Sequence, residues 1–124
     1  MNNSNNLMAV LLVFITVMMV VSGQSLWKYQ LKKLDDSDMS IFKKYIFLIK
    51  SYTFWVGASA YIFATVMWIY ILSKFDFSLV HPLNCMGYIL ALIIGKFVFN
   101  EPVGLIRIVG VIVIIIGVII ITRQ

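Results

Sequence analysis

The sequence predicts an all-α integral membrane protein, a bundle of four transmembrane helices in a single membrane domain over residues 1–124. Hydrophobic residues make up 62% of the chain and charged residues 12%, whereas soluble domains carry about a quarter charged residues. Backbone groups in lipid must be satisfied within the spanning structure, which leaves helices or a closed barrel. Barrel strands would alternate apolar and polar residues, but this chain has unbroken apolar runs such as 111–116. The helical class follows.

Four apolar stretches have the length of a spanning helix, about 20 residues at 1.5 Å each. The first ends at an aromatic and cationic boundary of Trp27, Lys28 and Tyr29. Before the fourth, we expect Asn100 to cap the helix and Glu101 and Pro102 to lie at its start. The expected spans are Leu7–Leu26, Tyr52–Leu72, Leu79–Phe99 and Val103–Ile121.

The long link over residues 27–51 contains an amphipathic pattern. Phe42, Tyr45, Ile46 and Ile49 fall on one helical face, and three lysines lie elsewhere. Residues 39–50 therefore form either a short helix in the membrane interface or an extension of the second span.

The distribution of cationic residues predicts a fixed orientation in the plasma (cytoplasmic) membrane. Eight of them lie on one side of the predicted spans, against Lys74 and Arg123 on the other. Both termini should be outside, with the link 27–51 and the turn near residue 100 in the cytoplasm. The eight are Lys28, Lys32, Lys33, Lys43, Lys44, Lys50, Lys96 and Arg107.

The chemistry of an enzyme is not indicated. Cys85 is a lone cysteine, and no nucleotide-binding loop, zinc motif or nucleophile motif occurs. The first acidic residue is Asp35, so the first span has no carboxylate of the kind that couples protons to cation export. We expect no catalytic residue, metal, cofactor or nucleic-acid partner; the partners should be membrane lipids.

The third span carries a polar face formed by His81, Asn84, Tyr88 and Gly95. Such a face either contacts another helix or lines a pathway. With Thr16 and Gln24 of the first span, the polar residues His81, Asn84 and Tyr88 are the candidate substrate-binding residues.

Small residues form two possible close-packing surfaces. Gly87, Ala91 and Gly95 form a ridge on the third span, and Gly110 and Gly117 share a face of the fourth. Two such surfaces exceed what four helices need among themselves, which indicates a partner.

Three cationic residues at helix ends, Lys28, Lys96 and Arg107, allow two interpretations. They are either anchors that fix the topology or a rim that binds phosphate.

The chain resembles the drug/metabolite transporter superfamily, in its four-helix small-multidrug-resistance-like branch. The resemblance lies in the order and spacing of four short motifs. They are Gly23-Gln24 followed by Lys28, Val80-His81-Pro82-Leu83, Asn100-Glu101-Pro102-Val103, and the segment from Gly110 to Gly117, which is similar to the branch's dimerisation helix.

Drug exporters of this branch have a glutamate three residues before the glycine matched by Gly23, and that position here is Val20. Flippase subunits for undecaprenyl-phosphate-linked sugars, of the aminoarabinose type, are the more similar subgroup. They look alike at Gly23-Gln24, Lys28, Trp55, Gly57, Met67-Trp68, Pro82 and Glu101-Pro102.

This resemblance implies a transporter subunit that moves a polyprenyl-phosphate-linked sugar, or a similar lipid carrier, from the inner to the outer leaflet. It would work as a homodimer, or as a heterodimer with a paralogous four-helix subunit, with contacts at Gly110 and Gly117. The alternatives are a small-multidrug-resistance-type exporter of small cationic compounds and a non-transporting regulatory membrane subunit.

Overall fold

A computed structural model describes residues 3–35 and 39–123, and the side chains from residue 5 onward in the first segment. The described chain is built from helices, four stretches of which are long and apolar enough to cross a membrane. This confirms the four-span, all-α class. The helices are α1 (Asn3–Asp35), α2 (Ile41–Lys50), α3 (Tyr52–Lys74), α4 (Phe77–Leu83), α5 (Met86–Phe97) and α6 (Leu105–Thr122).

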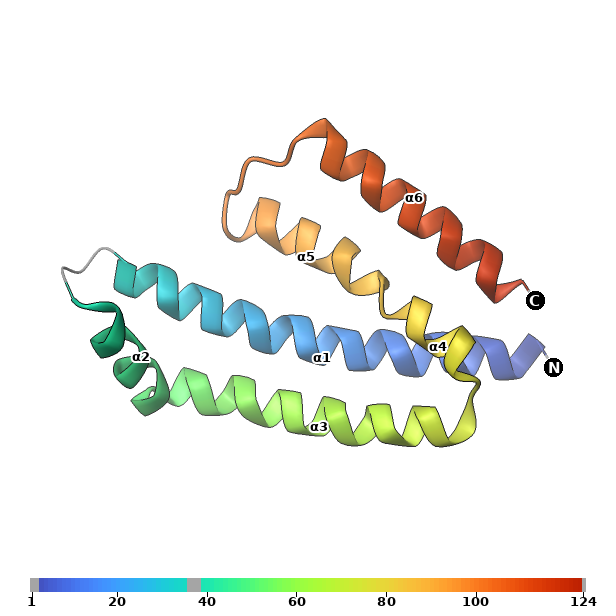
Figure 1. Cartoon of the computed structure of the whole chain (residues 1–124), viewed down its shortest axis with the longest axis horizontal. Helices are drawn as coiled ribbons and strands as arrows, with labels where there is room; N and C mark the ends of the chain where they lie inside the picture. The colour runs from blue at the N-terminus through green and yellow to red at the C-terminus, as the bar shows by residue number, and fades with distance from the viewer. Residues whose placement is uncertain (1–2, 36–38, 124) are drawn as a thin grey trace.

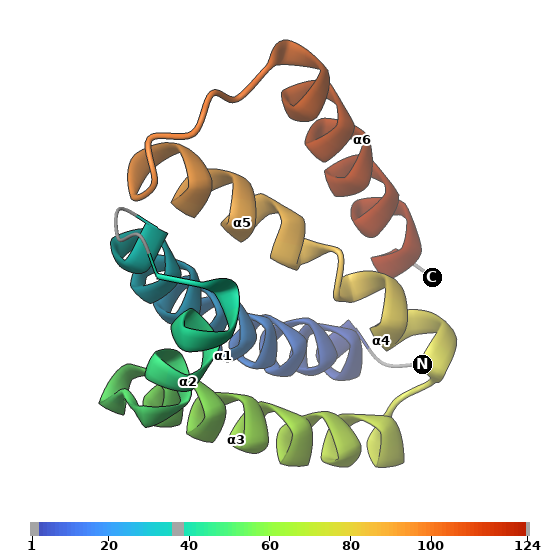
Figure 2. The same cartoon turned by 60° about the vertical axis from the view of Figure 1, so that its left-hand side comes forward.

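Helices α1 and α3 run side by side, α1 lies between α3 and α5, and α6 lies on the outer side of α5, inclined to α3 (Figures 1 and 2). The start of α1 and the end of α6 lie at one end of the molecule (Figure 1). The α1–α2 connection and the α5–α6 connection lie toward the other end (Figure 1). The topology is therefore that of a small bundle in which consecutive spans alternate in direction.

Helix α1 continues well past the expected boundary at Leu26 and ends at Asp35. The residues after Trp27 are mostly good helix formers, and Lys32 and Lys33 lie in the last turn, where cations are favourable near the carbonyl end of a helix. The boundary cluster thus marks a change of composition and not the end of the helix. The acidic residues Asp36 and Asp38 lie outside the described part of the chain.

Helix α2 is separate from α3, so it does not extend the second span. Ser51 adopts an extended conformation, with φ −78° and ψ 143°, and breaks the helical path. Its hydroxyl accepts a hydrogen bond from the Phe54 backbone amide at 3.2 Å, which caps the first turn of α3. On α2 only Leu48 is buried, and its remaining apolar side chains are exposed.

The third expected span, Leu79–Phe99, consists of two helices, α4 and α5, and this corrects the prediction of a continuous helix. Pro82 lies inside α4 and cannot donate a backbone hydrogen bond. The amides of Asn84 and Cys85 instead bond to His81 and Pro82, at 3.2 and 3.0 Å. These three-residue bonds are of the 3₁₀ type, so the chain is wound more tightly at this point.

The expected cap at Asn100 is also wrong. Asn100 has φ 52°, a left-handed conformation that asparagine tolerates better than most residues, and it ends the α5 segment. The Glu101 amide then bonds to the Gly95 carbonyl at 2.9 Å. Helix α6 begins only at Leu105, with Gly104 as its N-cap, so Glu101 and Pro102 lie in the link and not in the first turn.

The core is one apolar cluster between α1, the end of α3 and α4. It is formed by Ala9, Val13, Val17, Val21, Ile71, Leu79, Val80 and Leu83. Within the described residues 105–122, no residue of α6 is buried. The surface of α6 is therefore available to lipid or to a partner, as a membrane helix requires.

Two joined clefts as the candidate substrate site

The five candidate substrate-binding residues line one cleft of about 800 Å³ between α1, α3 and the α4–α5 segment. Of the residues that line it, all of them described, none is an aspartate, glutamate, lysine or arginine. We call this space the neutral cleft. It brings together residues from distant parts of the sequence: Thr16, Gln24, His81, Asn84 and Tyr88.

The α3 wall of the neutral cleft was missed from the sequence. Tyr61, Thr65 and Trp68 line it, and their spacing of four and three residues places them on one helical face. This polar and aromatic spacing within an apolar span is the signal that could have identified them.

Tyr61 is held in position by its neighbours on α1. Its hydroxyl accepts a hydrogen bond from the Gln24 side-chain amide at 3.3 Å, and its ring stacks on Trp27 with centroids 5.8 Å apart. Trp27 also stacks on Phe54 at 5.7 Å and donates its indole N–H to the Phe54 carbonyl at 3.1 Å. The aromatic α3 wall of the cleft is therefore supported by Trp27 of α1.

The five predicted residues differ in how available they are. Tyr88 is 62% exposed, and Asn84 and Gln24 are exposed. His81 stacks on Phe77 with centroids 4.7 Å apart. Thr16 is buried and donates its hydroxyl to the Leu12 carbonyl at 2.9 Å, so it can offer a ligand only an acceptor.

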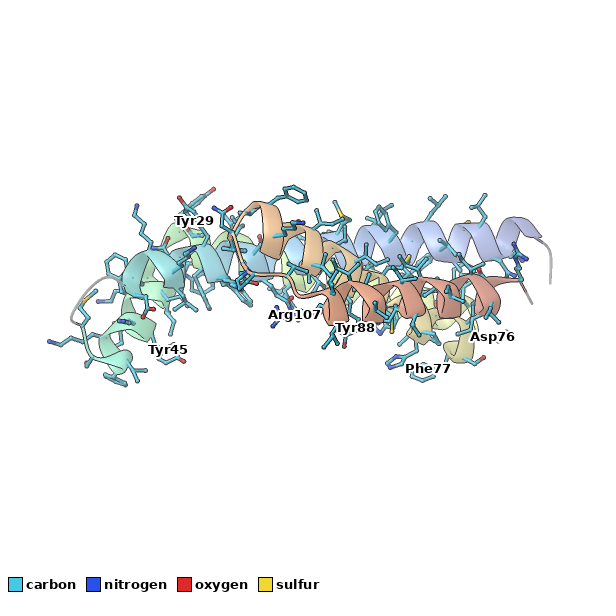
Figure 3. The ribbon with its side chains drawn as sticks, turned by 90° about the horizontal axis from the view of Figure 1, so that it is seen from above. Tyr29, Tyr45, Asp76, Phe77, Tyr88 and Arg107 are labelled. Atoms are coloured by element: carbon cyan, nitrogen blue, oxygen red, sulfur yellow. The ribbon has the colours of Figure 1, made fainter. Side chains whose placement is uncertain are left out.

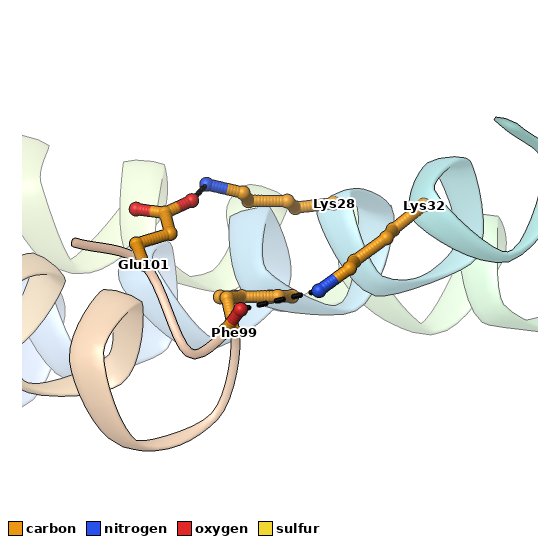
Figure 4. A network of polar contacts seen from close by, with 4 residues as sticks. All are labelled: Lys28, Lys32, Phe99 and Glu101. Carbon is orange, nitrogen blue, oxygen red and sulfur yellow. Dashed lines mark hydrogen bonds and ion pairs between the residues drawn. The ribbon is translucent and has the colours of Figure 1, made fainter.

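A second cleft, of about 470 Å³, lies between α1, α5 and α6. Three of its lining residues are charged, namely Lys28, Glu101 and Arg107, and we call it the charged cleft. Lys28 and Glu101 form an ion pair, and Lys32 donates a hydrogen bond to the Phe99 carbonyl at 3.1 Å. Figure 4 shows these contacts tying α1 to the α5–α6 link.

The electrostatics of the charged cleft keep Glu101 ionised at neutral pH. The hydrogen bond from Lys28 lowers the pKa of the Glu101 carboxyl below its ordinary value; desolvation opposes this shift, and the charges of Lys28, Arg107 and Lys32 add to it. Lys28 also lies over the Phe99 ring, 4.8 Å from its centroid. The site therefore holds opposite charges side by side.

The structure separates the three candidate phosphate-binding residues. Lys28 and Arg107 line the charged cleft, but Lys96 lines neither cleft. Its ammonium lies 5.9 Å from the centroid of its neighbour Phe97. Of the two interpretations of the helix-end cations, the geometry of Lys96 favours an anchor.

The two clefts share part of their lining. Val21, Gln24, Tyr88 and Ala91 line both of them. Tyr88 and Arg107 lie along the same side of the molecule in Figure 3. The neutral and the charged cleft are therefore adjacent.

The glycine ridges have different surroundings. A Cβ on Gly87 would lie 3.2 Å from Val17, and one on Gly95 would lie 3.0 Å from the Glu101 carboxylate. These contacts are internal, so this ridge does not indicate a partner. Added Cβ atoms on Gly110 and Gly117 would meet nothing within 4 Å, and their role as dimer contacts stays a prediction.

These observations define a multi-pass helical membrane protein with a polar site between its helices. Two curated proteins are similar to it, each named "Probable 4-amino-4-deoxy-L-arabinose-phosphoundecaprenol flippase subunit ArnE". The one from Pseudomonas syringae pv. syringae (strain B728a) is 27% identical over 70 residues, 56% of this chain and 65% of that protein. The one from Pseudomonas savastanoi pv. phaseolicola (strain 1448A / Race 6) is 25% identical over 76 residues, 61% of this chain and 67% of that protein.

The match to the first of these relatives spans less than two thirds of its length. No protein-family profile matches the chain, and no solved structure does. The two similarities agree with the resemblance to flippase subunits of the small-multidrug-resistance-like branch.

Proposed function

We propose that this chain is a subunit of a flippase that moves a polyprenyl-phosphate-linked sugar, or a similar lipid carrier, from the inner to the outer leaflet. The observation that carries the proposal is the junction of the neutral and charged clefts at Gln24, Tyr88 and Ala91. Such a substrate has a polar sugar next to a phosphate. The joined clefts offer complementary surroundings to the two parts.

The neutral cleft suits a sugar. Tyr61, Trp68 and Tyr88 offer aromatic surface, and Gln24 and Asn84 offer amide donors and acceptors. Lys28 and Arg107 in the charged cleft suit the phosphate. The prenyl tail would stay in lipid beside α6, whose described residues are not buried.

The main alternative is an exporter of small cationic compounds, and the geometry does not favour it. Val20, at the position of the exporters' glutamate, lines the neutral cleft. The described residues that line this cleft include no aspartate or glutamate that could replace the exporters' glutamate. A proton-coupled exporter would need such a group.

Photo-crosslinking in the cells that naturally make the protein tests the proposal. Benzoyl-phenylalanine would replace Tyr88 in the clefts or, as a control, Ile112, which is exposed on α6 and lines neither cleft. We expect the adduct at position 88 to carry a polyprenyl phosphate with its sugar, identified by mass spectrometry, and the control to carry only bulk phospholipid. Identical bulk-lipid adducts at both positions would contradict the proposal and favour a regulatory role.

We further propose that the subunit has both termini outside the cytoplasmic membrane. The eight-to-two distribution of cationic residues supports one orientation. An antiparallel homodimer needs both orientations, so the remaining assemblies are a parallel homodimer and a pair with a paralogous four-helix subunit. Gly117 is the clearer candidate contact, because Gly110 also lines the charged cleft.

Cysteine labelling in intact cells checks this orientation. In a Cys85→Ala background, single cysteines would replace Ser40, before α2, and Asp76, between α3 and α4, both of which are exposed. A membrane-impermeant maleimide should label the cysteine at 76 and leave the one at 40 unlabelled until the cells are opened. Equal labelling of both sites in intact cells would mean dual topology and would restore the antiparallel homodimer.

A further inference from the structure

Glu101 places a carboxylate inside the charged cleft, against the two cations that would bind a substrate's phosphate. One carboxylate oxygen accepts a hydrogen bond from the Lys28 ammonium, and Arg107 lines the same cleft. The proposed anion subsite is thus already occupied by an anion of the chain itself (Figure 4).

Glu101 also contacts the end of α5. The Glu101 amide bonds to the Gly95 carbonyl at 2.9 Å. Gly95 has no side chain and so leaves room for the second carboxylate oxygen of Glu101. A Cβ on Gly95 would lie only 3.0 Å from that oxygen. The turn after α5 therefore brings Glu101 to this place, and Gly95 leaves space for its carboxylate beside Lys28.

The ion pair itself is open to exchange. The Lys28 side chain is 51% exposed and that of Glu101 is 36% exposed. Ion pairs at this exposure contribute little to stability, because water competes for both partners. An incoming anion can therefore replace the carboxylate on Lys28 at little cost to the fold.

We propose that Glu101 is an internal counter-ion, which offsets the charge of Lys28 in the empty cleft and is displaced by the phosphodiester of the lipid carrier. This inference rests on the proposed function for the identity of the ligand. A phosphodiester carries one negative charge, as a carboxylate does, so the exchange leaves the charge on the cations unchanged. Without the carboxylate, the empty cleft would hold two uncompensated cations at the edge of the membrane.

A counter-ion role and a purely structural role of Glu101 predict different results for Glu101→Gln. The amide oxygen of glutamine can still accept a hydrogen bond from Lys28, but it no longer competes as a charge. If Glu101 is a counter-ion, the variant should bind a phosphodiester about two- to fivefold more tightly, the range that an exposed ion pair is worth. If Glu101 only connects α1 to the α5–α6 link, binding of the phosphodiester should be unchanged or weaker.

Binding would be measured by microscale thermophoresis on the protein purified with its partner from native membranes. The probes are a polyprenyl methyl phosphodiester, the matching polyprenol, and lipid-free dimethyl phosphate. We expect Glu101→Gln to tighten binding of the phosphodiester lipid and not of the polyprenol. Adding Lys28→Gln to Glu101→Gln should abolish the gain. Asp35→Asn, which removes the ion pair of Asp35 with Lys44 at 3.1 Å, outside both clefts, should match the wild type.

Unchanged or weaker binding by Glu101→Gln overturns the inference, even where the crosslinking of Tyr88 supports the flippase. Glu101→Gln could instead tighten binding of the phosphodiester lipid while crosslinking at position 88 yields only bulk-lipid adducts. That combination would support the anion exchange and contradict the proposed flippase function. A gain for dimethyl phosphate of the same size as for the lipid assigns the exchange to a free phosphate ester instead of a lipid. Thermal melting of each variant separates a change in binding from a loss of fold.

Discussion

Replacing Gly57 with alanine is expected to destabilise the bundle strongly, through a single added methyl group. A Cβ at Gly57 would lie 2.4 Å from the indole nitrogen of Trp27, which is far inside van der Waals contact. The backbone of α3 also approaches Gly23 of α1, where a Cβ would lie 2.9 Å from the Gly57 carbonyl oxygen. The α1–α3 crossing therefore depends on glycine at both positions.

The Trp27 ring cannot move aside without losing contacts. It lies between Phe54 and Tyr61 and donates its N–H to the Phe54 carbonyl. Its displacement would break that hydrogen bond and disturb the aromatic wall of the neutral cleft. Overpacking of this kind costs about 1–3 kcal/mol.

Thermal unfolding of the purified protein in detergent, followed by tryptophan fluorescence, checks this prediction. The control is Ser59→Ala on the same helix, at an exposed residue whose hydroxyl bonds only locally, to Val56. We expect a clearly lower Tm for Gly57→Ala and a Tm near the wild type for Ser59→Ala. Equal Tm values for both variants would contradict the close crossing of α1 and α3.

The number of spans could be predicted from the sequence because it depends on the solvent. Long apolar runs and few charges specify helices in lipid, whatever their tertiary contacts. The ends of the helices were less predictable. Nothing in the composition after Trp27 stops α1, and the Asn100 pattern suits either a helix start or the left-handed turn that it forms.

The candidate site was predictable in part for the same reason. Polar residues inside spans are rare, so His81, Asn84 and Tyr88 stood out, and they line one cleft with Thr16 and Gln24. The ion pair of Lys28 with Glu101 joins residues 73 positions apart. It depends on the path of the α5–α6 link, and that path follows from tertiary packing that no local pattern records.

The second large effect is expected from blocking the junction of the clefts. Ala91 lines both of them and is exposed, so Ala91→Trp would fill space beside both the sugar and the phosphate surfaces without entering the core. Ile93 is two residues along the same helix, is 46% exposed and lines neither cleft. Ile93→Trp is therefore the matched control for adding an indole to α5.

Lipid flipping by the complex, purified through a tag on this chain and returned to liposomes, tests the central claim most directly. A polyprenyl phosphosugar is placed in one leaflet, and its appearance in the other is followed by oxidation of the sugar with membrane-impermeant periodate. We predict movement faster than in protein-free liposomes for the wild type and for Ile93→Trp, and a fall to the protein-free rate for Ala91→Trp. A wild-type rate equal to that of protein-free liposomes, or an Ala91→Trp rate equal to that of Ile93→Trp, would contradict transport through the joined clefts.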